Sequence, residues 1–203
     1  MPMDLINFIK EHKELEQAQV VQGLFGNASR DQNSLYQKCL PVTDFHAPLI
    51  KDLLEIMYKT MVAEHGIGIA ANQLGINLQI FIIETNHEDS EARYKDLLNV
   101  KKQIFINPKI ISHSESVQKG IEGCLSFPGI TAEVDRWYEV SAEYQNLNGN
   151  KKIINAKGLL ARAIQHELDH LNGVLFIDKI SPVKKILLDG KLKKLLKETK
   201  KTI

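Results

Sequence analysis

One short stretch of this sequence has residue types and spacing suited to metal chemistry. "QHELDH" at 165–170 contains His166, Glu167 and His170 in the pattern H-E-x-x-H. Residues four apart lie on one face of a helix, so the two imidazoles can bind the same ion. A glutamate next to the first of them can reach water at an open coordination position. The pattern is typical of metal-assisted hydrolysis, which ordinarily needs a third protein ligand. Alone it is only moderately specific, because an ordinary helix with two surface histidines shows the same three letters.

The sequence that follows this pattern offers no convincing third ligand. One class of zinc proteases continues as H-E-x-x-H-x-x-G-x-x-H. Gly173 fits that continuation, but Phe176 occupies its last position and cannot bind a metal. Other zinc proteases take a glutamate from a later helix. The acidic residues after the pattern are Asp178, Asp189 and Glu198, the last of them within a lysine-rich end. A general zinc peptidase is therefore disfavoured.

A cysteine upstream is another candidate ligand. Cys124 stands in "IEGCLSFPGI", a short apolar stretch bounded by turn-forming residues. A free cysteine is most often a small buried hydrophobic residue. A thiol beside a metal is instead deprotonated, and Gly123 would let the backbone approach a ligand closely. Both interpretations of Cys124 are open on these grounds, whereas Cys39 has no comparable surroundings and is interpreted as structural.

A glycine-rich stretch is suited to contact with a peptide backbone. "EHGIGIAANQLG" at 64–75 has Gly66 and Gly68 two residues apart, followed by two alanines and Gln73. The pattern Gly-x-Gly is weak by itself, and no strand is expected before it, which argues against a nucleotide-binding fold. Small residues would let a peptide lie close to the chain, and the Gln73 amide could donate to a substrate oxygen.

Taken together, these stretches closely resemble the peptide deformylase family. That family has three signatures in order: G-x-G-hydrophobic-A-A-x-Q, E-G-C-L-S and Q-H-E-x-D-H. This chain reads "GIGIAANQ" at 66–73, "EGCLS" at 122–126 and "QHELDH" at 165–170. The resemblance runs from about Pro41 to Ser181. Three signatures in register are far more specific than any one of them.

The resemblance implies a hydrolase that removes the N-formyl group from formyl-methionyl peptides and nascent chains and releases formate. It implies one divalent metal ion bound by Cys124, His166 and His170. Fe²⁺ is the expected ion, with Zn²⁺, Ni²⁺ or Co²⁺ as substitutes, because thiolate and imidazole ligands suit iron and zinc alike. Glu167 is implied as the general base and then the general acid.

The resemblance also implies how the substrate is held. The Gln73 amide and the backbone N–H of Leu125 are expected to stabilise the tetrahedral oxyanion. Main-chain groups of Ile67 and Gly68 are expected to pair with the substrate like an added strand. The residues expected to bind the substrate are Ile67, Gly68, Gly123 and Ala163, with the imidazole of His166 beside the methionine pocket.

The chain departs from the family at two places. Many members have an arginine that pairs with the glutamate of E-G-C-L-S. Thr131 stands there in this chain and cannot neutralise Glu122, so either Arg136 or Arg162 substitutes for the arginine or the loop is arranged differently. Residues 1–40 form a divergent N-terminal extension. These departures sustain one alternative function, a non-catalytic or weakly active relative that serves as a metal-stabilised binding module.

Charge is distributed unevenly along the 203 residues. The formal net charge is +1, from 26 basic and 25 acidic side chains. Nine lysines and two acidic residues lie from Lys179 onward, which leaves 17 basic and 23 acidic residues in 1–178, a net of −6. A basic tail can be a solvated helix face or can bind a polyanion. In the family, such a C-terminal helix implies docking on ribosomal RNA, which is expected here for 182–203.

The sequence favours a cytoplasmic protein. No apolar run approaches the roughly 18 residues of a membrane span, and "MPMDLINFIKEHKELE" lacks the pattern of a signal peptide. Two cysteines are too few for a disulfide framework, as is usual in a reducing compartment. Neither a membrane nor DNA is expected as a partner.

The elements that would position these residues follow from periodicity and turn formers. The expected helices cover 1–22, 44–66, 158–171 and 182–201, the expected strands 78–84 and 103–111, and a hairpin about Asn148-Gly149 covers 138–156, with connections at 26–34 and 85–102. These elements predict an α+β fold in which antiparallel sheets pack around the central H-E-x-x-H helix, with N-terminal helices and a C-terminal helix. Residues 1–203 are expected to form one domain.

Overall fold

The computed structural model describes residues 3–12, 18, 20, 34–45, 48–86 and 100–199 of the chain. The helices are α1 (Met3–His12), α2 (Pro48–Ala63), α4 (Gly158–Leu171) and α5 (Pro182–Thr199), with short 3₁₀ helices η2 (Ser34–Tyr36), η3 (Ala71–Leu74) and η4 (Phe176–Asp178). The strands are β1 (Gly68–Ala70), β2 (Ile80–Ile83), β3 (Gln103–His113), β4 (Val117–Gly123), β5 (Thr131–Trp137), β6 (Glu139–Gln145) and β7 (Lys151–Lys157).

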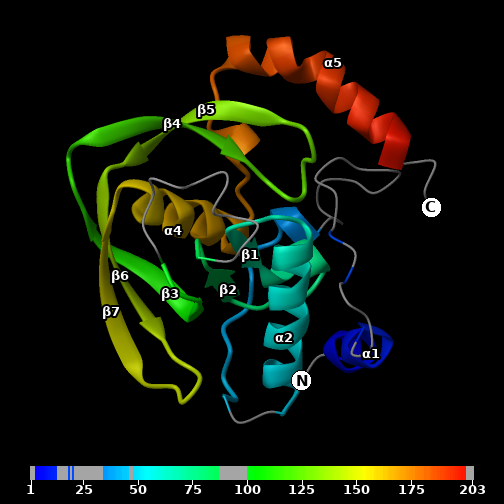
Figure 1. Cartoon of the computed structure of the whole chain (residues 1–203), viewed down its shortest axis with the longest axis vertical. Helices are drawn as coiled ribbons and strands as arrows, with labels where there is room; N and C mark the ends of the chain where they lie inside the picture. The colour runs from blue at the N-terminus through cyan, green and yellow to red at the C-terminus, as the bar shows by residue number, and fades with distance from the viewer. Residues whose placement is uncertain are drawn as a thin grey trace.

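Two antiparallel sheets enclose the central helix. Five strands pair in the order β1-β2-β3-β6-β7, and β4 pairs with β5 in a separate two-stranded ribbon. Helix α4 contacts β1, β2 and β7 of the larger sheet and β5 of the ribbon, and it is seen between them in Figure 1. The predicted α+β fold around the H-E-x-x-H helix is confirmed.

Helix α4 buries one face because its small and apolar residues recur at helical spacing. Ala161, Ile164 and Leu171 are almost fully buried in the cluster that also contains Phe81 and Phe105 of the larger sheet. Such burial stabilises the fold by roughly 25 cal/mol for each Å² of apolar surface removed from water. The helix that carries both histidines is thus fixed to the sheet.

Gly173 ends the turn after α4. Its φ is +70°, which favours glycine, and a Cβ there would lie 2.4 Å from the carbonyl oxygen of Tyr36. The backbone N–H of Cys39 donates to the carbonyl of Leu171 over 2.8 Å nearby. Gly173 therefore serves this close approach of the chain and does not indicate a protease pattern.

Helix α2 ends three residues earlier than predicted. Gly66 is expected to stop the helix, but α2 ends at Ala63 and the residue with a positive φ, 55°, is His65. The N–H of Gly66 donates to the carbonyl of Met61 over 2.8 Å, which caps the end. Gly66 has a different role: a Cβ there would lie 3.0 Å from Cδ1 of Leu125.

The N-terminal extension packs on α2. Leu5 and Ile9 of α1 are 1% and 4% exposed and belong to the same core cluster as α2. The backbone N–H of Ala18 donates to Oγ1 of Thr60 over 2.9 Å. The predicted helix over 1–22 is thus found at Met3–His12. The connection expected at 26–34, apart from Ser34, lies outside the described residues, as does 87–99 of the connection expected at 85–102.

The predicted strands at 78–84 and 103–111 and the predicted hairpin match β2, β3 and β6–β7. Gly149 has a φ of +76° at the hairpin turn. Strands β1, β4 and β5 were not expected. The inward side chains of the ribbon are in part polar or absent, so the ribbon lacks the apolar alternation that marks a half-buried strand.

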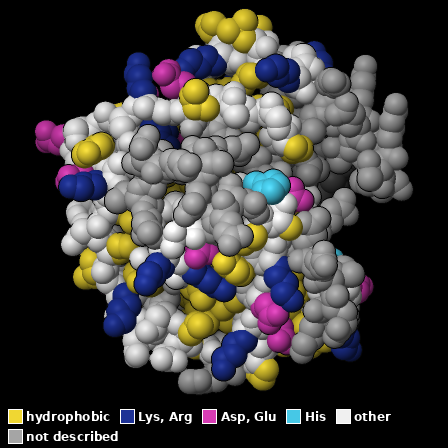
Figure 2. Space-filling view, viewed as in Figure 1, with side chains coloured by type: hydrophobic (Ala, Val, Ile, Leu, Met, Phe, Trp, Pro, Cys, Tyr) yellow, Lys and Arg dark blue, Asp and Glu magenta, His cyan; other side chains and the backbone are white. Residues whose placement is uncertain are grey.

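Helix α5 is found where the basic helix is predicted, and Gly190 does not break it. It leaves Val183, Ile186 and Leu187 exposed, and Figure 2 shows hydrophobic and basic side chains together at the top of the molecule, over α5. Lys184 Nζ lies 2.9 Å from Oε2 of Glu133 in β5. None of the described helices combines the length and apolarity needed to cross a bilayer.

Candidate metal centre

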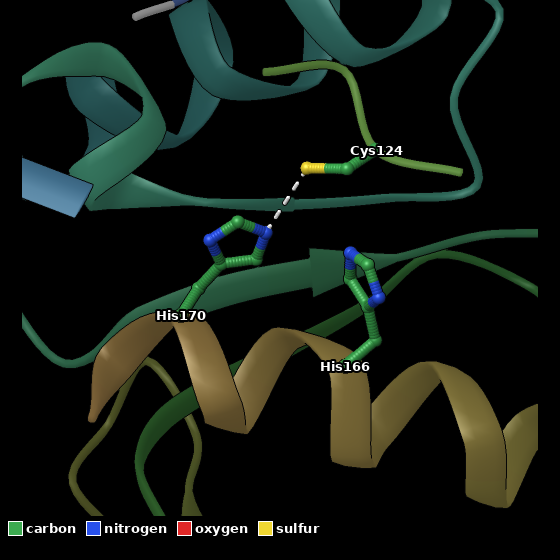
Figure 3. A group of neighbouring side chains, drawn as sticks. All are labelled: Cys124, His166 and His170. Carbon is green, nitrogen blue, oxygen red and sulfur yellow. Dashed lines mark hydrogen bonds between the residues drawn. The ribbon is translucent and has the colours of Figure 1, made fainter. Parts of the chain in front are cut away.

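Three side chains from two parts of the chain meet beside α4. The ligand atoms of Cys124, His166 and His170 all lie within 4.8 Å of one another. Cys124 directly follows β4 and the histidines lie one turn apart on α4, as Figure 3 shows. Sγ of Cys124 is 3.2 Å from Nε2 of His170. The three predicted ligands are thus together.

These donor atoms suit one divalent cation. Nδ1 of His166 donates to Oε2 of Glu122 over 2.9 Å, which leaves Nε2 as the ring nitrogen that can bind a metal once it is deprotonated. His170 is 1% exposed, and its Nδ1 has no hydrogen-bond partner among the described residues. One sulfur and two imidazole nitrogens form a set that suits iron or zinc. The residues present therefore fit the metal that the sequence predicts.

The two imidazoles differ in their electrostatic surroundings. Burial lowers the pKa of His166, but its hydrogen bonds with Cys124 and Glu122 raise that pKa well above the ordinary value. Burial, together with the charge of His166, holds the pKa of His170 well below its ordinary value. A bound cation would compete with a proton for the imidazole of His166.

Glu167 is a buried carboxyl group next to the ligands. Its side chain is 4% exposed, and its Oε2 has no hydrogen-bond partner in the described part of the chain. Burial raises the pKa of Glu167 to about 7, against the lowering effect of the charge of His166. A carboxyl group with such a pKa can accept and return a proton near neutral pH.

Gly68 leaves the space that Glu167 occupies. A Cβ at Gly68 would lie 2.4 Å from Oε1 of Glu167. The backbone of β1 can therefore approach the carboxylate closely, as expected where a peptide lies along this strand.

The amide of Gln73 faces the same cluster. The backbone N–H of Ala70 donates to its Oε1 over 2.9 Å, which fixes the orientation of the amide. Its Nε2 then lies 3.5 Å from Sγ of Cys124 and 3.3 Å from Oγ of Ser126. Gln73 thus presents hydrogen-bond donors to the site.

A cavity of about 690 Å³ opens onto these groups. Nine of the ten predicted site residues line it: Ile67, Gly68, Gln73, Gly123, Cys124, Leu125, Ala163, His166 and Glu167. The tenth, His170, is not among the lining residues but belongs to the ligand cluster. Ile121, Leu159 and Arg162 also line the cavity and were not predicted.

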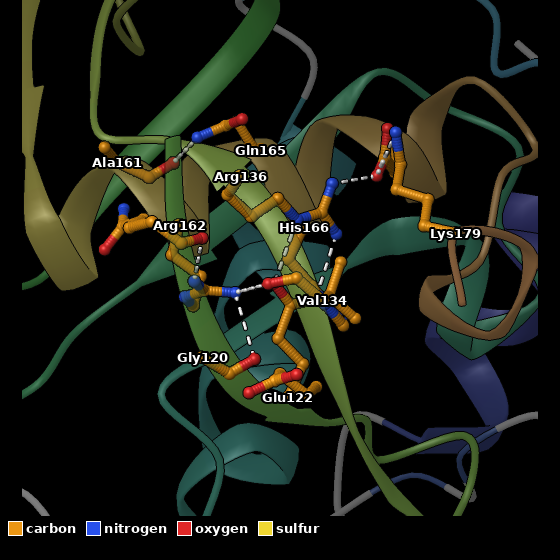
Figure 4. Close-up of polar contacts among 12 residues, drawn as sticks. Gly120, Glu122, Val134, Arg136, Ala161, Arg162, Gln165, His166 and Lys179 are labelled. Carbon is orange, nitrogen blue, oxygen red and sulfur yellow. Dashed lines mark hydrogen bonds and ion pairs between the residues drawn. The ribbon is translucent and has the colours of Figure 1, made fainter. Parts of the chain in front are cut away.

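Glu122 is the principal residue that the sequence analysis did not assign to the site. Its carboxylate is 5% exposed and accepts from Arg136 Nε and Nη2, both over 2.9 Å, and from Arg162 Nη1 over 2.7 Å (Figure 4). Burial raises its pKa, but the hydrogen bonds from Arg136 and His166 bring it well below the usual range. Both candidate arginines thus neutralise Glu122, so no arginine is needed at position 131.

Arg136 continues this network to α4. It also pairs with Asp169, whose Oδ2 lies 3.3 Å from Nζ of Lys179. Its own pKa would be lowered by burial but is raised overall by Glu122 and Asp169. The pairing of Glu122 with these arginines was predicted in part from the sequence, whereas its contact with His166 and the contact of Arg136 with Asp169 were not.

Comparison with known proteins gives one consistent family. The sequence matches the family described as polypeptide deformylase over residues 28–186, a wider range than the motifs indicated. A peptide deformylase of Helicobacter pylori (strain HPAG1) is 45% identical over 159 residues, which cover 78% of this chain and 87% of the relative.

The fold is similar to solved structures of the same enzyme. A peptide deformylase of Plasmodium falciparum superposes with a TM-score of 0.75 and 36% identity, over 90% of this chain and 98% of that chain. A plant peptide deformylase superposes with a TM-score of 0.78 and 31% identity, over 91% and 92% of the two chains.

Proposed function

The chain belongs to the polypeptide deformylase family, and on that premise we propose that its reaction takes place at Cys124, His166, His170, Glu167 and Gln73. The protein is a metal-dependent hydrolase that removes the N-formyl group from formyl-methionine at the start of newly made proteins and releases formate. The observation that supports this site is the convergence of three ligand atoms within 4.8 Å beside a buried, unpartnered carboxyl oxygen. The alternative of a non-catalytic binding module is not favoured.

The proposed metal ligands are Cys124, His166 and His170. When bound there, a divalent ion supplies Lewis acidity, which makes water nucleophilic near neutral pH. We propose Fe²⁺ as the native ion, with Zn²⁺, Ni²⁺ or Co²⁺ as substitutes. The thiolate and imidazole donors support iron and zinc equally, so the test is metal analysis of protein purified without oxygen.

Glu167 is the proposed general base and acid. Its Oε2 has no protein partner among the described residues and its pKa is raised toward neutrality by burial, so it can take a proton from the attacking water. The same oxygen can then deliver that proton to the leaving amine of methionine. Glu167 therefore carries the proton through both halves of the reaction.

The tetrahedral oxyanion is proposed to accept hydrogen bonds from Gln73 Nε2 and from the backbone N–H of Leu125. The fixed amide of Gln73 supports this role, because a donor oriented before the reaction requires no reorganisation. Ile67 and Gly68 are proposed to bind the substrate backbone. Gly123 and Ala163 are proposed to contact the rest of the substrate. All four residues line the cavity beside Glu167.

Residues 1–203 are proposed to act as a single domain, with the extension 1–40 as part of it. The packing of Leu5 and Ile9 against α2 supports this. A cytoplasmic location is also proposed, since an unpaired Cys124 must stay reduced to bind metal.

Helix α5 is proposed to dock on ribosomal RNA. Lys185, Lys191 and Lys193 are exposed on it, and binding to a polyanion through them would weaken steeply as salt increases. The test is co-sedimentation with ribosomes over a salt series, with the three lysines changed to alanine as the variant. If these lysines bind RNA, the variant should lose ribosome binding and keep its deformylase activity.

The experiment that tests the site is formate release from formyl-Met-Ala-Ser, with acetyl-Met-Ala-Ser as the control substrate. Protein purified without oxygen and loaded with iron or nickel should hydrolyse the formyl peptide and leave the acetyl peptide intact. Glu167→Ala should abolish turnover while it keeps the metal. Turnover of the variant at the wild-type rate would contradict the assignment of Glu167.

A further inference from the structure

The proposed metal site is divided between two parts of the fold. Cys124 follows β4, which belongs to the two-stranded ribbon, whereas His166 and His170 belong to α4. The ribbon is not hydrogen-bonded to the larger sheet. The distance from the thiol to the imidazoles therefore depends on contacts between the ribbon and α4.

Arg162 makes the densest set of these contacts. It lies one turn before His166 on α4 and is only 7% exposed. Its Nη1 donates to Oε1 of Glu122 over 2.7 Å and to the carbonyl of Val134 over 2.9 Å, with Gly120 at 3.3 Å. Its Nη2 donates to the carbonyl of Gln118 over 2.9 Å. One guanidinium thus holds both strands of the ribbon (Figure 4).

Gly120 provides the space for this guanidinium. A Cβ at position 120 would lie 2.8 Å from both Cζ and Nη2 of Arg162 and 3.0 Å from its Nε. Gly120 is not among the glycines with a positive φ, so its backbone conformation is open to any residue. The side chain is absent here because Arg162 occupies its place.

Glu122 connects this contact to the metal ligands. One of its oxygens accepts from Arg162, and the other accepts from Nδ1 of His166. Arg136 bridges the two oxygens. A shift of the carboxylate would therefore turn the imidazole of His166, because that ring is held through the same group.

We propose that Arg162 is a positioning residue of the metal site, which holds β4 and Glu122 against α4 and so sets the orientation of His166 and its distance from Cys124. Gly120 is required for this role because it admits the guanidinium. This inference rests on the proposed ligand set. A lysine could not replace Arg162, since one ammonium group cannot span Glu122 and the carbonyls of both strands.

The test uses the full chain loaded with Co²⁺, whose visible spectrum reports the ligand geometry. Gly120→Ala displaces the guanidinium without removing a polar group, and Arg162→Met removes it. Both variants are expected to change the ligand-field bands and to release Co²⁺ to a chelator about 10- to 100-fold faster. In the Arg162→Met background, Gly120→Ala is expected to have no further effect.

Gln118→Ala is the matched control. Its Nε2 donates to the carbonyls of Gly158 and Trp137, so the variant loses a contact between the ribbon and α4 that does not involve Glu122. Its spectrum and release rate are expected to match the wild type. A structural role alone would instead give equal loss of thermal stability in Gln118→Ala and Gly120→Ala with unchanged cobalt release, and that result would overturn the proposal.

The ligand set and the role of Arg162 can fail separately. A wild-type spectrum without a thiolate charge-transfer band, or one unchanged by Cys124→Ser, would reject the ligand set. A normal thiolate band with wild-type release in Gly120→Ala would reject the role of Arg162. Gly120→Ala alone decides the question if Arg162→Met does not fold.

Discussion

Nε2 of Gln73 lies 3.5 Å from Sγ of Cys124, while Oε1 of the same amide accepts the N–H of Ala70 over 2.9 Å. The hydrogen bond from Ala70 determines which end of the amide faces Cys124. A backbone N–H can only donate, so it holds the amide oxygen of Gln73 away from the site. The donor end of Gln73 is therefore oriented before any substrate arrives. Such preorganised donors often stabilise an oxyanion more than flexible ones do.

Gln73→Leu is expected to lower kcat about 10²- to 10³-fold, the usual effect of losing one oxyanion donor. Gln73→Glu should be at least as impaired, because its carboxylate would present an acceptor to the oxyanion. The measurement is formate release at saturating formyl peptide. Ser126→Ala serves as the control, since it removes a neighbour of Gln73 and leaves the amide held by Ala70. A wild-type kcat in Gln73→Leu would exclude the proposed role.

Gly68→Ala is expected to lose most of its activity while it keeps its metal. The added Cβ would lie 2.4 Å from Oε1 of Glu167, so the carboxylate or β1 must move. The measurements are formate release and metal content of the same sample. Gly190→Ala is the control, because no atom of the described residues lies within 4 Å of its Cβ position, and it should retain full activity. Equal activity of the two variants would show that Glu167 tolerates displacement.

Much of the site could be predicted from sequence because its chemistry is local. His166, Glu167 and His170 lie within one helical turn, and the helix period alone brings the imidazoles together. Cys124 differs, because no periodicity relates residue 124 to α4. Its place at the site followed from the family resemblance, and the structure brings its sulfur to 3.2 Å from His170.

The ribbon shows why the remainder was not predicted. Strand β4 places Gln118, Gly120 and Glu122 toward α4, where an apolar strand would place hydrophobic residues. These residues are polar or lack a side chain because they receive Arg162, a residue 40 positions from Glu122. Hydrophobic alternation detects strands that bury apolar side chains, so a strand fixed by a buried guanidinium gives no such signal. The end of α2 was also predicted wrongly. The positive φ that follows the helix belongs to His65, and a glycine is the residue that sequence reasoning expects in that conformation.

The two cysteines are expected to differ sharply in reactivity. Burial raises the pKa of Cys39 to about 12, so at pH 8 only about 1 in 10⁴ of these thiols is ionised, and the thiolate is the nucleophile. Cys124 is partly exposed at the cavity. Iodoacetamide at pH 8 should therefore label Cys124 in metal-free native protein and label Cys39 only after unfolding.

Mass mapping of the labelled peptides measures both rates. Added Zn²⁺ should protect Cys124, because a coordinated thiolate is shielded from the reagent. For Cys39 the rate should stay low until the pH approaches 12, since its thiolate appears only as pH rises toward the raised pKa. Labelling of Cys39 as fast as Cys124 in the native protein would show that the core around it opens.

Leu5→Ala is expected to destabilise the protein without changing its catalysis. Leu5 is 1% exposed in the cluster that contains α2, and loss of a buried leucine side chain typically costs about 2 to 5 kcal/mol. A value near the lower end, about 2 to 3 kcal/mol, is expected because α1 lies at the edge of the core. The measurement is urea unfolding, with deformylase activity assayed well below the transition.

Ile6→Ala is the matched control on the same helix: Ile6 is 36% exposed, so its substitution should cost under about 0.5 kcal/mol. Equal stability of the two variants would show that α1 does not pack on the body in solution and is an appendage of the domain.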